Sequence, residues 1–164
     1  TRINKIITQF LSYAKPIEIQ ISSVDSKAYF DDLIRLFSEQ AKQKGIHLMR
    51  LTNKSILVRI DPELMKQSLI NIIQNAIDAV SENGSVEISY AVNQKDFVIN
   101  VSDTGTGISD EMKKKIFNLY FTTKKEGNGL GLSIAQKIVT QHGGTIEVIS
   151  QLNKKTTFRI NIPQ

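Results

Sequence analysis

The segment 61–82 constrains the fold most, because it predicts one long and mostly apolar helix. Asp61-Pro62-Glu63 supplies an acceptor at the N-cap, a proline in the first turn and an acid after it, which is how helices commonly begin. The helix is expected to stop before Asn83-Gly84. Its apolar residues are Leu69, Ile72, Ile73, Ala76, Ile77, Ala79 and Val80.

The remaining pattern alternates helices with pairs of strands. Further helices are expected at about 26–44, 109–116 and 130–142, and strands at 17–21, 46–52, 55–60, 85–92, 97–102, 145–150 and 156–162. The strands 46–52 and 55–60 are expected to form a hairpin around Asn53-Lys54. This order predicts an α+β two-layer sandwich: a mixed, mostly antiparallel sheet with about three helices on one face.

The N-terminal segment 1–14 has an apolar stripe at helical spacing, which Lys15-Pro16 ends. We interpret residues 1–15 as the end of a neighbouring domain and residues 16–164 as a domain of their own. The alternative is an ordinary first helix of this same domain. Because the chain has no initiator methionine, we expect it to be part of something longer.

Composition excludes several kinds of site. The chain has no cysteine, which rules out disulfides, thiol nucleophiles and thiolate zinc sites, and its two histidines argue against a multi-histidine metal site. A net charge of +5 mildly favours an anionic partner. The lysines are scattered without interleaved aromatics, so we expect no nucleic-acid partner. No apolar run reaches the roughly 18 residues of a membrane span, and we expect a cytoplasmic location, leaving open whether the parent is membrane-tethered.

Three polar residues lie in register on the helix 61–82. Asn71, Asn75 and Asp78 are spaced i, i+4 and i+7, which makes one polar stripe. Amide oxygens are hard ligands that suit Mg²⁺, and an amide NH₂ can donate to phosphate. The alternative is a solvated polar face.

The sequence Asp103-Thr-Gly-Thr-Gly107 directly follows an expected strand. Alternating glycines let the backbone approach a flat ligand closely. An ionised carboxylate accepts hydrogen bonds only, so it can take the exocyclic amine of adenine but is repelled by the carbonyl oxygen of guanine. A tight turn without a ligand is the alternative.

A second glycine-rich run, "GNGLGL" at 127–132, leads into the helix 130–142. Such a loop presents backbone N–H groups and the positive end of the helix dipole, which together favour phosphate. It is not a Walker A loop, because no Gly-Lys-Ser/Thr follows. Phe117 and Phe121 either anchor a flexible lid over 119–129, from which Lys124 reaches a phosphate, or belong to the core.

In this order and spacing, the segments resemble the ATP-binding catalytic domain of bacterial sensor histidine kinases, of the GHKL (Bergerat) ATPase superfamily. The asparagine helix resembles the N box, "DTGTG" the G1 box, residues 117–124 the F box and "GNGLGL" the G2 box. "HGGTIEV" and "TTFRINIP" resemble the closing hairpin, and the opening 1–16 resembles the end of the second helix of the dimerisation and phosphoacceptor domain. The compact lid looks most like the nitrogen-regulation and Bacillus sporulation kinases.

The resemblance implies ATP and Mg²⁺ as cofactors and a set of roles. Asn75 is expected to coordinate Mg²⁺, with Asn71 beside it, and Lys124 to contact the γ-phosphate. Asp103 is expected to bind the adenine amine, with Thr156 near the adenine through its hydroxyl or a water. The other expected nucleotide-binding residues are Gly105 and Gly107 at the pocket floor, Thr123 in the lid, and Gly129 and Gly131 at the phosphates. Lys155 departs from the family, because a glycine commonly precedes that threonine.

The resemblance further implies transfer of the γ-phosphoryl group to a histidine of the dimerisation and phosphoacceptor domain, in a parent that is a homodimer and acts on a response regulator indirectly. Neither His47 nor His142 has the context of an acceptor, so both are expected to be structural. The alternative is an ATP-hydrolysing or serine-phosphorylating module of the superfamily. Hydrolysing relatives carry a glutamate where this chain has Asn71, and an amide is a poor general base, which favours transfer.

Overall fold

A computed structural model describes residues 18–124 and 127–164 of the chain. The predicted helix 1–14 and the boundary between 1–15 and 16–164 lie outside these residues. The helices are α2 (Ser26–Gln43), α3 (Pro62–Ala79), α4 (Asp110–Lys113) and α5 (Gly131–Gln141). The strands are β1 (Ser22–Asp25), β2 (His47–Arg50), β3 (Leu57–Ile60), β4 (Ser85–Asn93), β5 (Asp96–Asp103), β6 (Thr145–Ser150) and β7 (Thr156–Pro163).

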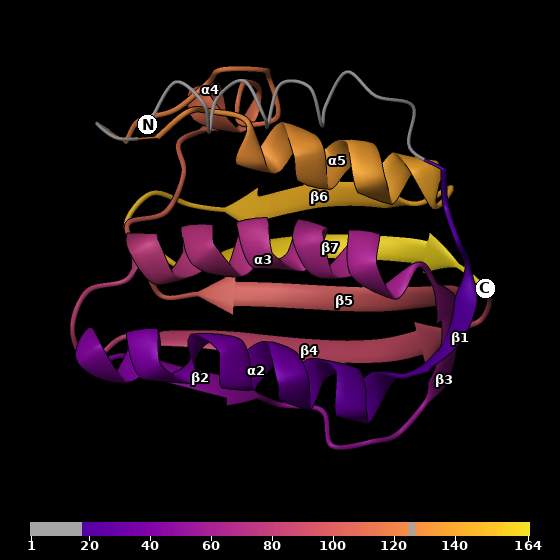
Figure 1. Ribbon diagram of the computed structural model, residues 1–164. Helices are drawn as coiled ribbons and strands as arrows, with labels where there is room; N and C mark the ends of the chain where they lie inside the picture. Colours follow the sequence, from indigo (N-terminus) through magenta and orange to yellow (C-terminus); the bar gives the residue numbers. More distant parts are fainter. Residues whose placement is uncertain (1–17, 125–126) are drawn as a thin grey trace, which may run out of the picture.

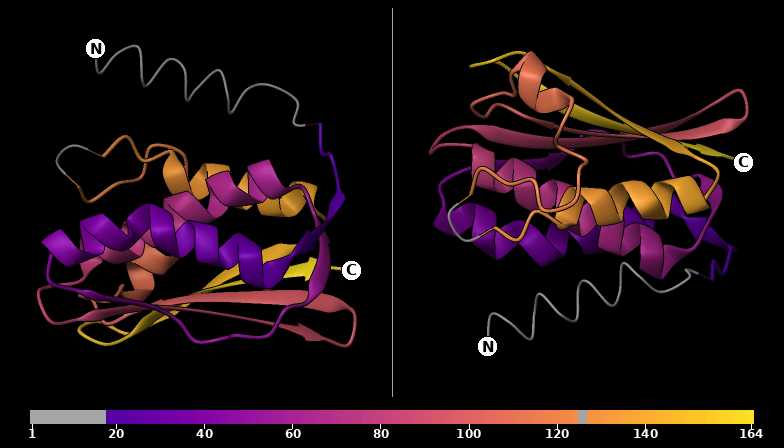
Figure 2. Two further views of the ribbon diagram at one scale, coloured as in Figure 1. Left: turned by 60° about the horizontal axis from the view of Figure 1, so that its bottom comes forward. Right: turned by 90° about the horizontal axis from the view of Figure 1, so that it is seen from above.

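The molecule has two layers. One is a five-stranded sheet in the order β2-β4-β5-β7-β6, in which only the β2–β4 pair is parallel. The other consists of α2, α3 and α5, which lie side by side over one face of the sheet (Figures 1 and 2). The predicted α+β two-layer sandwich, with a mostly antiparallel sheet and three helices on one face, is confirmed.

The hairpin expected from 46–52 and 55–60 does not form. β2 pairs in parallel with β4, whereas β3 pairs antiparallel with β1 in a separate two-stranded sheet. Hydrogen bonds attach the two ends of the connecting segment to different elements. Thr52 exchanges hydrogen bonds with the backbone of Tyr90 on β4, and Ile56 bonds with Ser26 at the start of α2. Asn53-Lys54 therefore lies in a connection between two different sheets and not in a tight hairpin turn.

The strand expected at 17–21 is also wrong for its described part, because residues 18–21 form no strand and β1 begins at Ser22. Its partner β3 ends at Ile60, opposite Ser22. The backbone N–H of Gln20 instead donates to the carboxylate of Asp61, 2.8 Å away. The alternating isoleucines predicted a strand, but the partner strand β3 ends opposite Ser22 and leaves residues 18–21 without a strand to pair with.

Aspartate side chains cap the starts of α2 and α3, and the Asp61 cap was expected from the sequence. Asp25 accepts from the N–H of Ala28 at the start of α2, and Asp61 accepts from two N–H groups at the start of α3. The ends are less accurate: α3 stops at Ala79, three residues before the expected 82, because Val80 is extended. Only 110–113 of the short helix expected at 109–116 is regular helix.

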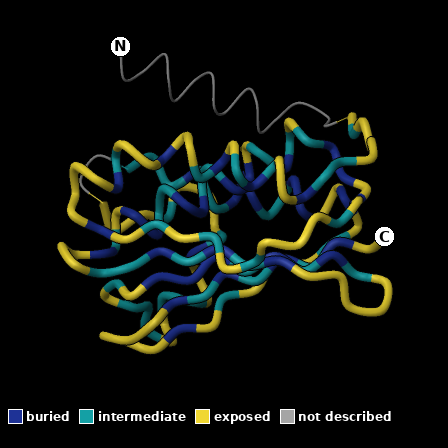
Figure 3. Tube along the Cα trace, turned by 90° about the horizontal axis from the view of Figure 1, so that it is seen from below, coloured by how far each residue is buried: buried dark blue, intermediate teal, exposed yellow. Residues whose placement is uncertain are grey.

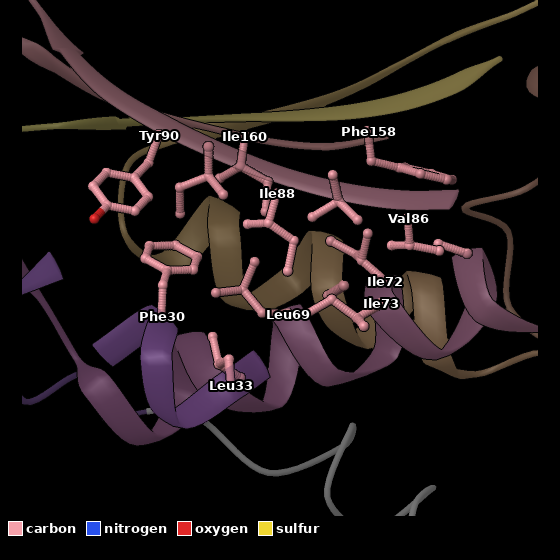
Figure 4. Close-up of a cluster of buried hydrophobic side chains, with 14 of the residues drawn as sticks. Phe30, Leu33, Leu69, Ile72, Ile73, Val86, Ile88, Tyr90, Phe158 and Ile160 are labelled. Atoms are coloured by element: carbon pink, nitrogen blue, oxygen red, sulfur yellow. The ribbon is translucent and has the colours of Figure 1, made fainter. Parts of the chain in front are cut away.

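The core lies between the helices and the sheet. Side chains of α2 and α3 point at those of β4 and β7 in Figure 4, and buried positions concentrate where the two layers face each other in Figure 3. Leu69, Ile72 and Ile73 of α3 are fully buried, as are Phe30 of α2 and Ile88 of β4. The predicted apolar helix is thus the centre of the core.

His142 joins the far ends of two helices. It is buried at the C-cap of α5, where its Nδ1 lies 2.8 Å from the carbonyl oxygen of Ile138. Its Nε2 accepts the backbone N–H of Asp61, the N-cap of α3, at 3.0 Å. The structural role expected of His142 agrees with this geometry, whereas His47 is exposed on the edge strand β2.

Across the described residues, the helices are too short or too polar for any of them to cross a lipid bilayer.

Replacing Leu69 by alanine should lower the free energy of unfolding by about 2–5 kcal/mol, because it leaves a cavity in a fully buried site. Leu57→Ala is the matched control: Leu57 is 72% exposed, and its truncation should cost less than about 0.5 kcal/mol. Urea unfolding followed by circular dichroism measures both. Equal losses in the two variants would contradict the assignment of α3 as the core helix.

Candidate functional site

A cavity of about 520 Å³ lies at one end of the helical layer. In Figure 1, α3 ends, β5 ends, β7 begins and α5 begins at this same end. The loop between α4 and α5 closes the remaining side with residues 121–124 and 127–129. Four segments far apart in the sequence therefore meet around one space.

The cavity is lined by side chains and backbone of the predicted motifs and by an apolar wall. The lining residues are Gln74, Asn75, Asp78, Ala79, Asp103, Thr106, Gly107, Ile108, Met112, Ile116, Phe121, Thr122, Thr123, Lys124, Gly127, Asn128, Gly129, Gly131, Leu132, Thr156 and Phe158.

Asp103 stands at the end of β5, next to Thr156 of β7 in the strand register. It is only 3% exposed, and its Oδ1 accepts the N–H of Gly105 at 2.9 Å. Burial raises the pKa of Asp103 to about 6, against the opposing effects of the Gly105 hydrogen bond and the Lys155 charge. A buried carboxylate, ionised at neutral pH, thus lines the cavity, where a donor from a ligand would be a strong partner.

Apolar side chains form the walls beside Asp103. They come from the segment after β5, from α4 and its following turn, from α5 and from β7: Ile108, Met112, Ile116, Leu132 and Phe158. An apolar slot that ends in a buried acceptor suits a flat ring with an amino group. Sequence reasoning did not single out these five residues, although the inward alternation of β7 was a signal that could have found Phe158.

The other end of the cavity is polar. Asn75 and Asp78 face it from α3, and the ammonium of Lys124 lies 2.7 Å from Asn75 Oδ1 and 2.7 Å from Asp78 Oδ2. These two oxygens therefore bind the ammonium group of Lys124, a cation from the chain itself. Hard amide and carboxylate oxygens are also the donors that Mg²⁺ takes from proteins when phosphates supply further ligands, so the residues fit a divalent cation.

The N-terminus of α5 points into this polar end. Gly131 is its first residue and lines the cavity, and its N-cap residue is Leu130, whose side chain provides no cap, while the Leu130 N–H donates to Asn128 Oδ1. The backbone N–H groups at this N-terminus can bind an anion, and the helix dipole favours negative charge there. The predicted phosphate loop is thus placed beside the predicted metal ligand.

Two predicted residues do not line the cavity. Asn71 lies one turn away on α3, with its side chain against Gly131, where a Cβ added to Gly131 would be 3.4 Å from Asn71 Oδ1. Gly105 packs against the end of α3 and acts through its hydrogen bond to Asp103. The remaining predicted residues, which are Asn75, Asp103, Gly107, Thr123, Lys124, Gly129, Gly131 and Thr156, all line it.

Gly107 and Gly129 are required by backbone geometry. Their φ angles are +71° and +67°, a region that disfavours other residues. A Cβ on Gly107 would lie 2.1 Å from the carbonyl oxygen of Gln151, and one on Gly129 would lie 2.3 Å from the carbonyl carbon of Tyr120. Both glycines therefore allow loops to close tightly at the rim of the cavity.

Comparison with known proteins identifies the family. Residues 60–164 match the model of the histidine kinase-, DNA gyrase B- and HSP90-like ATPases. The chain belongs to this ATPase family. The match runs from α3 to β7 and so includes both ends of the cavity. Because this is an ATPase domain, its nucleotide is ATP.

Curated relatives of this ATPase domain include sensor kinases. The chain is 35% identical over 163 residues to the sensor histidine kinase ZraS of Escherichia coli K12, covering 99% of this chain and 35% of ZraS. It is 33% identical over 164 residues to sporulation kinase E of Bacillus subtilis, covering 99% of this chain and 22% of that kinase. The chain therefore spans about a third or less of these relatives.

Solved structures agree. The catalytic domain of the histidine kinase ThkA is 34% identical with a TM-score of 0.79, covering 88% of this chain and 97% of that domain. ThkA in complex with the response regulator TrrA gives 32% identity and a TM-score of 0.85, covering 99% of this chain and 47% of that one. The predicted resemblance to histidine kinase catalytic domains is confirmed.

Adenosine binding should weaken at acid pH, because the acceptor at the end of the slot must be ionised. With the pKa of Asp103 at about 6, affinity should be level above about pH 7 and fall about tenfold for each pH unit below about 6. Adenosine is used because it has no titrating phosphate, and isothermal titration calorimetry measures its affinity.

Asp103→Asn is the control for that experiment. Its amide does not titrate, so affinity should be low and independent of pH over the same range. A parent whose affinity stays level down to about pH 5 would contradict the role given to the Asp103 carboxylate.

Proposed function

We propose that this ATPase domain binds ATP together with Mg²⁺ and donates the γ-phosphoryl group to a histidine on a dimerisation and phosphoacceptor domain. One observation carries the proposal: a single cavity holds a buried carboxylate at one end and, at the other, α3 oxygens, a lysine and a helix N-terminus. A hydrogen-bond acceptor for an amino group at one end and an anion site at the other suit a nucleoside triphosphate. The name of ZraS, a sensor histidine kinase, supports a histidine as the phosphoryl acceptor.

In this arrangement the adenine lies in the apolar slot, and its amino group donates a hydrogen bond to the Asp103 carboxylate. The triphosphate then extends towards the first turn of α5, where Gly129 and Gly131 lie. Mg²⁺ bound to Asn75 would neutralise charge on the phosphates, as in other phosphoryl transfers. Lys124 already reaches this region and would exchange the Asp78 carboxylate, an exposed partner, for a phosphate oxygen.

The chemistry favours transfer over hydrolysis. The residue one turn before Asn75 is Asn71, whose amide cannot take a proton from water at neutral pH. Neither histidine of the chain lines the cavity: His142 is buried at the C-cap of α5 and His47 is exposed on β2. The acceptor histidine therefore belongs to a segment outside this sequence, and the candidate is the dimerisation and phosphoacceptor domain, of which we place only the end at 1–15.

ThkA has been solved with its response regulator TrrA. By analogy we propose that the parent of this chain is a homodimer that passes the phosphoryl group from its histidine to a response regulator. We place this catalytic half in the cytoplasm, because its nucleotide and its partner regulator are found there.

Asn75→Ala should abolish the tightening of ATP binding by Mg²⁺ and leave adenosine binding within about twofold of the parent, because adenosine has no phosphate to bridge to the metal. Calorimetric titrations with and without Mg²⁺ measure this. Asn161→Ala, an amide on β7 at the opposite end from Thr156, is the control and should keep the Mg²⁺ effect. A parallel loss of adenosine and ATP affinity would show that Asn75 is structural.

The chain incubated with labelled ATP and Mg²⁺ should bind nucleotide and acquire no phosphohistidine. Addition of the upstream helical hairpin of its own parent as a separate chain should produce acid-labile, alkali-stable label on that hairpin. The rate should rise with hairpin concentration, since the reaction is bimolecular. Label on His47 or His142, acid-stable label on a serine, or release of phosphate without label would each overturn the proposed transfer.

A further inference from the structure

Two buried hydroxyl groups meet beside the cavity. Ser150 ends β6 and Thr156 begins β7, and the two residues are directly paired in the strand register. Their side chains are 5% and 3% exposed, and Ser150 Oγ lies 2.7 Å from Thr156 Oγ1. Thr156 lines the cavity, whereas Ser150 lies behind it.

A third group decides the direction of this hydrogen bond. The backbone N–H of Ile108 donates to Ser150 Oγ at 2.9 Å, so the serine oxygen is an acceptor there. Were Thr156 also to donate to Ser150, the serine would accept twice and its own proton would have no acceptor among the described residues. An unpaired donor in a buried site is costly, by about 1–3 kcal/mol. Ser150 therefore donates to Thr156.

The proton of Thr156 is then left to point elsewhere. A hydroxyl has one proton and two lone pairs, and Thr156 Oγ1 already accepts from Ser150. Thr156 is paired with Asp103 across β5 and β7, and both residues line the cavity. The closed end of the slot thus offers a carboxylate acceptor and a hydroxyl donor side by side.

We propose that Ser150 is a positioning residue, which fixes the Thr156 proton towards the cavity and so makes the site require a ring-nitrogen acceptor beside an amino group. Adenine presents that pair, whereas guanine presents the reverse pair, a carbonyl oxygen beside a ring N–H. The inference rests on the proposed function, because it takes adenine to occupy the Asp103 end. It concerns direct contact of Thr156 with the ring or contact through one water.

The experiment compares ATP with 1-deaza-ATP, in which a C–H replaces the ring nitrogen next to the amine. The parent should bind ATP about tenfold tighter than the analogue, the loss expected for one buried hydrogen bond. In Ser150→Ala, Thr156 can rotate, so ATP affinity should fall to within about threefold of the analogue, while affinity for the analogue stays near the parent value.

Ser102→Ala is a matched control. Ser102 Oγ lies 2.8 Å from Thr157 Oγ1, a serine–threonine hydroxyl pair one position along β5 and β7 from Asp103 and Thr156. Because successive residues of a strand point to opposite faces, this pair lies on the face away from the cavity. The variant should keep the full preference for ATP, and melting temperatures report on folding in both variants.

The outcomes separate the two hypotheses. A parent that fails to bind ATP, or whose ATP affinity is unchanged in Asp103→Asn, overturns the proposed function. A parent that binds ATP through Asp103 but treats the two nucleotides alike, or a Ser150→Ala variant that keeps the preference or weakens both equally, overturns the role of Ser150 alone. Should Ser150→Ala not fold, Ser150→Cys carries the same test, because a thiol is a weak donor of similar size.

Discussion

The structure depends on the burial of α3. This helix is apolar around most of its circumference, and it packs on the sheet with α2 on one side and α5 on the other (Figures 1 and 4). Its buried residues contact β4, β5 and both neighbouring helices, so the position of α3 is fixed from several directions. The polar stripe on the remaining face of α3 is therefore held rigidly, and it places Asn75 and Asp78 at the cavity.

The site combines two opposite electrostatic environments. At one end, burial raises the pKa of the Asp103 carboxyl to about 6, so its charged form is disfavoured even with the Gly105 hydrogen bond, and a further donor from a ligand would stabilise it. At the other end, the partly exposed oxygens of Asn75 and Asp78 lie beside the N-terminus of α5 and are paired with the ammonium of Lys124. In the proposed function, recognition of the ring and binding of the charged chain of the nucleotide are thus separated in space.

The sequence was informative about local structure and much less so about pairing between distant strands. The start of α3 was predictable because a cap is a local interaction, as at Asp61. The partner of β2 was not, because a parallel pair with β4 depends on a long crossover and on bonds from Thr52 to Tyr90 that no short-range pattern encodes.

The same distinction holds for the cavity. Asp103, Asn75 and the glycine loop were found because each carries a local motif, and the order of motifs identified the family. The apolar wall was not found, since Met112 and Phe158 look like ordinary core residues until the fold places them around one space. Ser150 was missed for a further reason: its significance comes from a hydrogen bond to Ile108 across 42 positions of the sequence.

The hydrogen bond between Asp61 and His142 adds a fixed point to the packing of α3 against α5. α3 and α5 run antiparallel, and the Asp61–His142 bond ties them at the end away from the cavity. Asn75 lies about 21 Å from Asp61 along the helix axis, at 1.5 Å per residue. A tilt of about 3° between the two helix axes would displace Asn75 by about 1 Å relative to Gly131, a displacement of the size that matters for placing reacting groups. The Asp61–His142 bond and the packing of α3 on α5 both oppose such a tilt. Because the Gln20 N–H also donates to the Asp61 carboxylate, the backbone leading into β1 is attached to the same residue that joins α3 to α5.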